Sequence, residues 1–175
     1  GASVRTAALI TNMDSPLGSA VGNSLEVIES VEILKGKTSG DLWTVCRELS
    51  CRMLMLAGIG DKDECGRLVD EAVESGEALK RFEMMVKLQG GDVSYIEDTS
   101  KFRKASFSRE VYAPADGYIT HMDSEKIGLT AVLLGAGREK KDDDINHAAG
   151  IIIAAKTGDF VKRGELLATL FADDE

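Results

Sequence analysis

The chain has 175 residues, of which 43% are apolar and 29% are charged, with a formal net charge of -9 at pH 7. Nucleic-acid phosphates are bound by clustered lysine and arginine, so this charge argues against a nucleic-acid partner. No apolar run approaches the roughly 20 residues of a membrane-spanning helix, so we expect no membrane partner, and the length allows one ample domain or two small ones.

The first hundred residues are predicted to contain one strand and several helices. Residues 4–11, VRTAALIT, form a short apolar run typical of a buried strand, and a loop of small residues follows. Asn23 and Glu26 have the spacing of a capping box. Apolar residues at helical spacing then predict four helices, at 23–35, 41–57, 63–75 and 77–89, each ended by glycine or separated from the next by it. Because a single strand cannot satisfy its own backbone, we expect its partner strands outside this sequence.

The character of the chain changes near residue 96. The polar stretch at 97–110 lacks a clear period and is interpreted as a linker, with a boundary at about 100 to 108. Beyond it, residues 109–123 and 150–172 are typical of short strands with turns, and the apolar segment 127–137 is predicted to be helical. We therefore divide the chain into domains at 1–100 and 101–175 and assign it to the α/β class, α+β overall.

Few side chains stand out as chemical groups. Three cysteines lack zinc-site spacing, and two of them fall in a helical pattern, which indicates reduced thiols. No signal peptide is visible, so we expect a cytoplasmic protein. The remaining candidates are interpreted as surface or structural residues because no base or metal-ligand spacing accompanies them: His121, His147, Asp142, Asp143, Asp144, Ser108, Ser124 and Cys65.

Four stretches carry a resemblance to a known family. Residues 4–36, 81–92, 111–119 and 134–170 resemble, in this order, the pyrimidine-nucleoside and thymidine phosphorylases. The resemblance implies that 1–100 is the C-terminal part of the α/β domain of a phosphorylase. It also implies that 101–175 is most of the C-terminal α/β hammerhead domain.

The implied activity is that of a pentosyltransferase. Members of this family catalyse the reversible phosphorolysis of pyrimidine nucleosides to free base and (2-deoxy)ribose 1-phosphate. Their phosphate-binding and base-binding motifs precede the part of the family that this sequence resembles. We therefore expect an internal fragment of a homodimeric nucleoside-salvage enzyme, inactive by itself, with no catalytic or substrate-binding residue of its own and no organic cofactor.

The resemblance also implies a potassium half-site in the loop of small residues. Carried over by position, its ligands are the main-chain carbonyls of Leu17 and Ala20 and the carboxylate of Glu29. A hard cation prefers oxygen ligands, and small residues let a backbone turn its carbonyls toward one point. The alternative is that Glu29 is an ordinary solvated helix residue.

Two other classes of function remain open. The segments VYAPADGYI and KTGDFVKRGELL are similar in form to those of biotinyl or lipoyl carrier modules. Such carriers need a modifiable lysine on an exposed hairpin, whereas FADDE follows Leu170 here. A non-catalytic binding module is the third possibility, in which the unpaired strand would be completed by strand exchange in an oligomer.

Overall fold

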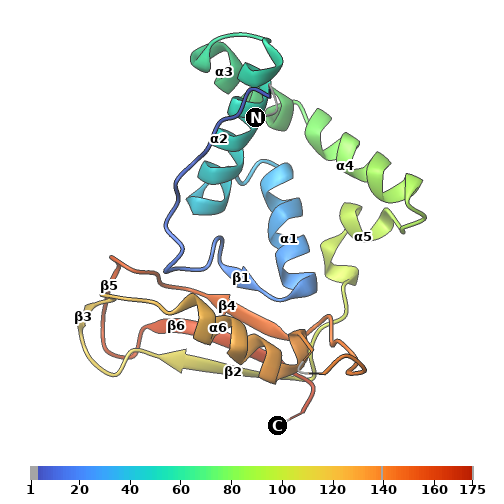
Figure 1. Ribbon diagram of the computed structural model, residues 1–175. Coiled ribbons are helices and arrows are strands. Elements are labelled where there is room, and N and C mark those ends of the chain that lie inside the picture. The colour runs from blue at the N-terminus through green and yellow to red at the C-terminus, as the bar shows by residue number, and fades with distance from the viewer. Residues whose placement is uncertain (1–3, 139, 175) are drawn as a thin grey trace. The chain divides into compact units, whose positions relative to one another are not determined.

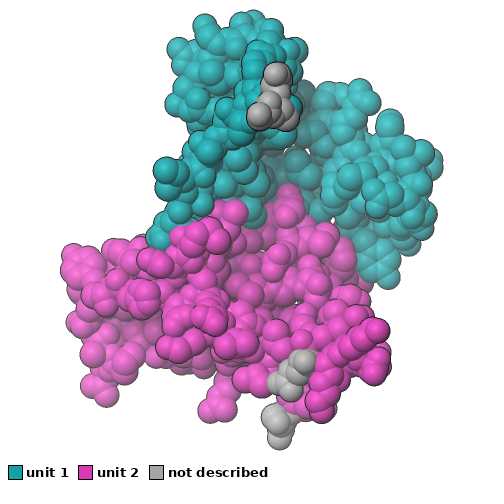
Figure 2. All heavy atoms as spheres, viewed as in Figure 1, with its two compact units in different colours: residues 1–12, 31–96 teal, residues 13–30, 97–175 magenta. Residues whose placement is uncertain are grey.

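The computed structural model describes residues 4–138 and 140–174. The chain forms two compact units, coloured separately in Figure 2. Unit 1 contains the described residues up to 12 together with 31–96, and unit 2 contains 13–30 together with the described residues from 97 onward. Residues 13–30 thus belong with the second half of the chain, whereas division by sequence placed them in the first domain. The assignment of 1–100 and 101–175 to two phosphorylase domains stays a prediction.

Unit 1 is helical. Its helices are the last residues of α1 (Asn23–Leu34), α2 (Gly40–Ala57), α3 (Lys62–Glu74), α4 (Glu77–Leu88) and most of α5 (Ser94–Glu97). The first four confirm the predicted helices to within one or two residues. Gly58 ends α2 in the left-handed region at φ 78°, and the Asp61 carboxylate caps α3 by accepting the Glu64 N–H at 2.9 Å.

Helices α2 and α3 pack through small buried side chains. Cys51 and Cys65 are almost fully buried, and the Cys51 thiol donates to the Lys62 carbonyl at 3.4 Å. At the edge of this contact Arg47 donates two hydrogen bonds to Asp70, at 2.6 and 2.5 Å. A bidentate pair of this kind fixes the relative orientation of its two helices.

The predicted strand at 4–11 is wrong. None of the sheets formed by the described residues includes this segment, which has no regular secondary structure. A strand is held by a ladder of hydrogen bonds to a neighbour, and no such neighbour is present within 4–138 and 140–174. The apolar side chain of Ile10 is consequently 97% exposed.

Unit 2 is built on an antiparallel four-stranded sheet with the strand order β1–β4–β6–β2 (Figure 1). The strands are β1 (Ala20–Val21), β4 (Gly150–Ile153), β6 (Leu166–Ala172) and β2 (Phe107–Tyr112). A second pair, β3 (Gly117–Tyr118) and β5 (Phe160–Val161), is joined by edge-to-face stacking of Tyr118 on Phe160. Strands are thus present in both segments where they were predicted.

One face of the sheet is covered by a helix. Helix α6 (Ser124–Ala131) continues as the π-helical turn η2 (Val132–Ala136), as predicted for 127–137, and Figure 1 shows it lying along the sheet. Ile151 and Ile153 point inward from β4 toward Ala131 of α6, and Ile152 between them is 40% exposed. This alternation is the period of two expected of a strand with one buried face.

Two local predictions need correction. The stretch 97–110, predicted as a linker, starts at the last residue of α5, contains the 3-10 turn η1 (Thr99–Lys101) and ends within β2. The predicted Asn23–Glu26 capping box does not form, because α1 already includes Asn23 and the Glu26 N–H donates to the Gly22 carbonyl at 2.9 Å. The Asn23 side chain donates instead to the Ala136 carbonyl at 2.8 Å. The Glu26 carboxylate accepts the N–H of Gly22 at 3.0 Å.

None of the described helices is both long and apolar enough to cross a bilayer.

Candidate functional site

The loop of small residues is closed onto the first helix by Glu29. The Glu29 carboxylate accepts the Ser19 N–H at 2.7 Å through Oε1 and the Ala20 N–H at 3.0 Å through Oε2. The side chain is half-buried and reaches the loop because it lies on the inner face of α1. A charged acceptor holding two backbone donors defines the conformation of the loop.

Glycine makes this approach possible. A Cβ placed on Gly18 would lie 2.6 Å from Oε2 of Glu29, and the φ of this residue is +75°. Any other residue would push the carboxylate away and would be strained in the left-handed region. The small size of residue 18 is therefore required by the position of Glu29.

Two peptide groups of the loop are bonded to Glu29 and to the sheet. The two peptide groups that donate to Glu29 join Gly18 to Ser19 and Ser19 to Ala20, and the Ser19 carbonyl accepts the Ile153 N–H at 2.7 Å. The carbonyls named by the resemblance, those of Leu17 and Ala20, belong to the flanking peptide groups. They are therefore not committed by the bonds to Glu29.

The donor set also suits a potassium ion. None of the ion pairs found within 4–138 and 140–174 involves Glu29, although its carboxylate is half-buried. No cluster of three or more His, Cys, Asp or Glu side chains able to hold a metal occurs among the same residues. A cation here would depend on main-chain oxygens and one carboxylate, which is chemistry typical of hard, weakly bound cations.

A second point of attachment holds the start of the loop. The Lys156 ammonium donates to the Pro16 carbonyl at 2.9 Å, and the Ser15 and Thr157 hydroxyls lie 3.3 Å apart. Lys156 was not predicted as a site residue and appeared in the sequence only within the segments KTGDFVKRGELL and 134–170. No local pattern could have identified it, because 140 residues separate it from Pro16.

A close approach of two backbones anchors the end of the loop. A Cβ on Gly22 would lie 2.5 Å from the Ala149 carbonyl oxygen, and one on Gly150 would lie 2.3 Å from the Val21 carbonyl oxygen. The Ser24 N–H at the start of α1 donates to the His147 carbonyl at 3.1 Å. The loop thus joins β1, β4 and α1 within unit 2.

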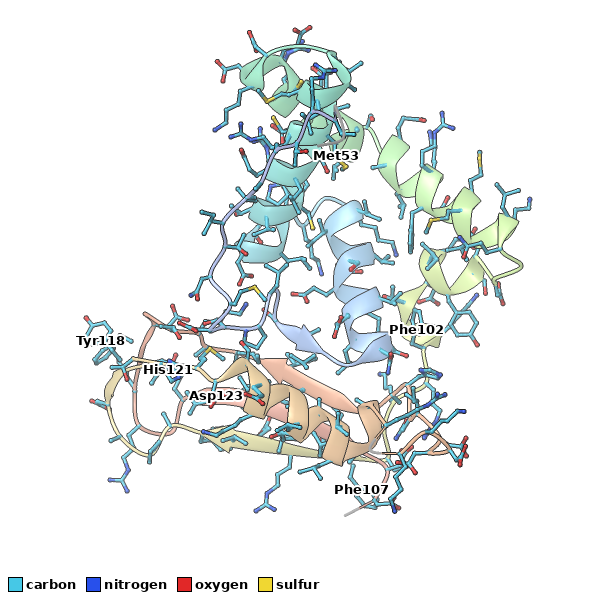
Figure 3. All side chains as sticks on the ribbon, in the orientation of Figure 1. Met53, Phe102, Phe107, Tyr118, His121 and Asp123 are labelled. Carbon is cyan, nitrogen blue, oxygen red and sulfur yellow. The ribbon has the colours of Figure 1, made fainter. Side chains whose placement is uncertain are left out.

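The histidines are not brought into a catalytic arrangement. His121 is exposed and lies near Asp123 at the start of α6 (Figure 3), while His147 contributes its main-chain carbonyl to α1. The pKa of Asp123 is lowered, first by the hydrogen bond from the Lys126 side chain and also by the nearby His121. Asp123 serves as the N-cap of α6 by accepting the Lys126 N–H at 3.0 Å.

The other polar candidates have structural roles or none. Burial raises the pKa of the Cys65 thiol, which disfavours the reactive thiolate. Asp143 accepts the Lys140 N–H at 2.7 Å within a local turn. Ser108 is exposed on edge strand β2, and the Ser124 hydroxyl is buried without a hydrogen-bond partner among the described residues.

Two further features of unit 2 lie away from the loop. Phe171 and Ala172 complete strand β6 rather than forming the exposed hairpin on which a carrier holds its lysine. An open groove of about 480 Å³ lies beside β2. It contains neither Glu29 nor any residue of the loop, since its lining is Phe107, Ser108, Arg109, Leu134, Leu170, Ala172 and Asp174.

Similarity to known proteins covers nearly the whole chain. It is 41% identical to the pyrimidine-nucleoside phosphorylase of Bacillus subtilis (strain 168) over 172 residues, which are 98% of this chain and 40% of that protein. The pyrimidine-nucleoside phosphorylase of Geobacillus stearothermophilus is 37% identical over 172 residues, which are again 98% of this chain and 40% of that protein. That of Staphylococcus aureus (strain COL) is 39% identical over 96% of this chain and 39% of the relative.

A family model agrees with these relatives. Residues 118–175 match the pyrimidine nucleoside phosphorylase C-terminal domain. The chain spans about 40% of the length of the curated relatives that it matches. On these matches, residues 118–175 carry the pyrimidine nucleoside phosphorylase C-terminal domain, and nearly the whole chain is similar to pyrimidine-nucleoside phosphorylases.

Proposed function

We propose that the protein containing this chain is a pyrimidine-nucleoside phosphorylase. It converts a pyrimidine nucleoside and phosphate reversibly to free base and (2-deoxy)ribose 1-phosphate, as a cytoplasmic homodimer. The observation that carries the proposal is 41% identity across 98% of the chain to a protein of that name. The chain spans only 40% of that relative, so the activity is proposed for a protein of the relatives' full length.

The mechanism relies on positioning rather than on a nucleophile from this chain. Phosphate attacks the anomeric carbon as the bond to the base loosens and positive charge develops on the sugar. Holding both substrates together and stabilising that charge supplies most of the rate. We assign no residue of this chain to the chemical step.

The proposed contribution of this chain is part of a potassium site. Leu17 and Ala20 would offer main-chain carbonyls, and Glu29 would offer its carboxylate. The two backbone hydrogen bonds at 2.7 and 3.0 Å support this role, because they hold Glu29 on the loop. A bound potassium ion would neutralise this carboxylate and link the loop to α1.

The test is a phosphate-dependent release of thymine or uracil by a chain of the relatives' full length that contains residues 1–175. Initial rates are measured as potassium chloride replaces sodium chloride at constant ionic strength. Glu29→Gln removes the negative charge and is expected to raise the half-activating potassium concentration by at least about tenfold.

Glu32→Gln is the matched control on the same helix. Its carboxylate pairs with Lys37 at 2.5 Å and does not contact the loop, so its potassium response is expected to match that of the unmodified enzyme. An unchanged response in Glu29→Gln would remove the ion from the proposal. Absence of any phosphate-dependent base release from the full-length chain would overturn the proposed activity itself.

A further inference from the structure

Lys156 connects two segments that are distant in sequence. Its ammonium donates to the Pro16 carbonyl at 2.9 Å, in a part-buried position. Pro16 directly precedes Leu17, whose carbonyl is one of the proposed potassium ligands. Ser19 lies two residues after Leu17, and its N–H donates to the Glu29 carboxylate at 2.7 Å. The Leu17 carbonyl therefore lies between two points at which the loop is fixed.

The base of this lysine is rigid. Within the turn from Lys156 to Asp159, the Lys156 N–H donates to the Asp159 carboxylate at 2.8 Å, and the Asp159 N–H donates back to the Lys156 carbonyl at 3.0 Å. The Gly158 N–H donates to the Ile119 carbonyl at 2.8 Å, and the Ile119 N–H donates to the Asp159 carbonyl at 2.9 Å. A rigid base makes the lysine an effective anchor, because less freedom is lost when its ammonium binds.

The next turn repeats this construction without reaching the loop. The Lys162 N–H donates to the Glu165 carboxylate at 2.8 Å, and the Glu165 N–H donates to the Lys162 carbonyl at 2.9 Å. Gly158 and Gly164 occupy the equivalent left-handed position, with φ of 100° and 82°. Lys162 is exposed, and its ammonium makes no hydrogen bond to Pro16 and no ion pair among residues 4–138 and 140–174. The bond to Pro16 is thus particular to Lys156.

We propose that Lys156 is a positioning residue, which holds the Pro16 carbonyl and so orients the neighbouring Leu17 carbonyl for a monovalent cation. This inference rests on the proposed potassium site and adds to it a residue from the C-terminal domain. It acts through the backbone of the loop, as outer-shell residues do in metal sites.

Two effects of Lys156 on cation binding oppose each other. Its positive charge repels a nearby cation, so removing the charge alone would tighten binding. Its hydrogen bond preorganises the loop, so removing the bond would weaken binding. Our proposal requires the second effect to exceed the first, which makes the direction of the change decisive.

The experiment uses the full-length chain and compares Lys156→Met with Lys162→Met. Each substitution removes one lysine charge from equivalent turns. We measure the potassium chloride concentration for half-maximal activation at constant ionic strength, together with the binding of thallium(I), a potassium substitute, by ²⁰⁵Tl NMR. Lys156→Met is expected to raise the half-activating potassium concentration and the dissociation constant of thallium(I), each by about tenfold. This is the lower end of the usual range for outer-shell residues of metal sites. Lys162→Met is expected to change neither.

A third variant separates orientation from general damage. Lys156→Arg keeps a cationic donor and is expected to recover at least part of the potassium response. A potassium response in Lys156→Met that is unchanged or tighter would overturn the proposal, as would equal weakening in Lys162→Met. If Glu29→Gln alters the potassium response and Lys156→Met does not, only this inference fails. If neither alters it, the potassium site fails as well.

Discussion

At the scale of single residues, close backbone approaches explain the small residues of the loop. Gly18 makes room for Glu29, and Gly22 and Gly150 let β1 and β4 meet. The sequence shows the accumulation of small residues, but it does not show which atoms need the space. In the structure, the Ala149 carbonyl oxygen lies close to where a Cβ of Gly22 would be, and the Val21 carbonyl oxygen lies close to where a Cβ of Gly150 would be. The pairing of β1 with β4 brings these atoms together from distant segments.

We predict that Gly150→Ala strongly destabilises unit 2. Its Cβ would lie 2.3 Å from a backbone oxygen that cannot rotate away, at a φ of +152°. Strain of this kind costs about 1 to 3 kcal/mol before the clash is added. Urea denaturation followed by circular dichroism measures the loss in the free energy of unfolding.

Gly158→Ala is the control for backbone strain alone. It also has a positive φ, of +100°, but a Cβ there would meet nothing within 4 Å. We expect a loss of only about 1 kcal/mol. Equal losses in Gly150→Ala and Gly158→Ala would show that the close approach between β1 and β4 contributes nothing.

At the scale of elements, the helices were predictable and the first strand was not. Helices α1 to α4 follow from apolar spacing and glycine stops, because a helix satisfies most of its hydrogen bonds within its own segment. Residues 4–11 have the composition of a strand, but a strand also needs a partner. The antiparallel neighbours of β4, in contrast, are present in unit 2.

The contact between α2 and α3 makes a prediction about pH. The hydrogen bonds from Arg47 lower the pKa of Asp70, and the charge of Arg47 adds to this effect. A lowered pKa in the folded state adds stability that is fully present above the unfolded pKa of about 3.9. That stability is lost as pH falls through the folded pKa.

Asp70→Asn should therefore destabilise unit 1 at pH 7, and the difference from the unmodified chain should shrink as pH falls below about 4. Both side chains are about a third exposed, at 34% and 35%, so solvent screening limits the loss to about 1 kcal/mol. Urea midpoints measured from pH 7 to pH 3 provide the check. Glu74→Gln on the same helix, whose carboxylate has no partner described within 4–138 and 140–174, should show no such convergence.

At the scale of the whole molecule, residues 1–175 are expected to fold without catalysing phosphorolysis. By resemblance, the groups that bind phosphate and base belong to parts of the family outside these residues. Without them the advantage of holding two reactants together is absent, which can be worth about 7 to 11 kcal/mol. Chromatography of thymidine or uridine incubated with phosphate and residues 1–175 should show no free base. Base release that needs phosphate and scales with the concentration of this chain would contradict the prediction.

The sequence by itself determined the class of the fold, the helices α1 to α4, the segments that contain β3 to β6, and the resemblance to the family. These depend on local periodicity, on glycine positions and on extended similarity, all of which are present in the linear order of residues. It also indicated the loop and Glu29 as a candidate site, because the resemblance extends through these positions.

Only the tertiary structure decided which residues hold that loop. Residues 13–30 join unit 2, since β1 pairs with β4 more than a hundred residues later. Lys156 reaches Pro16 across 140 residues, and Asn23 bonds to Ala136 instead of capping its helix. Such contacts depend on the packing of distant segments, and no local pattern specifies them, because each polar group has several possible partners until the chain is folded.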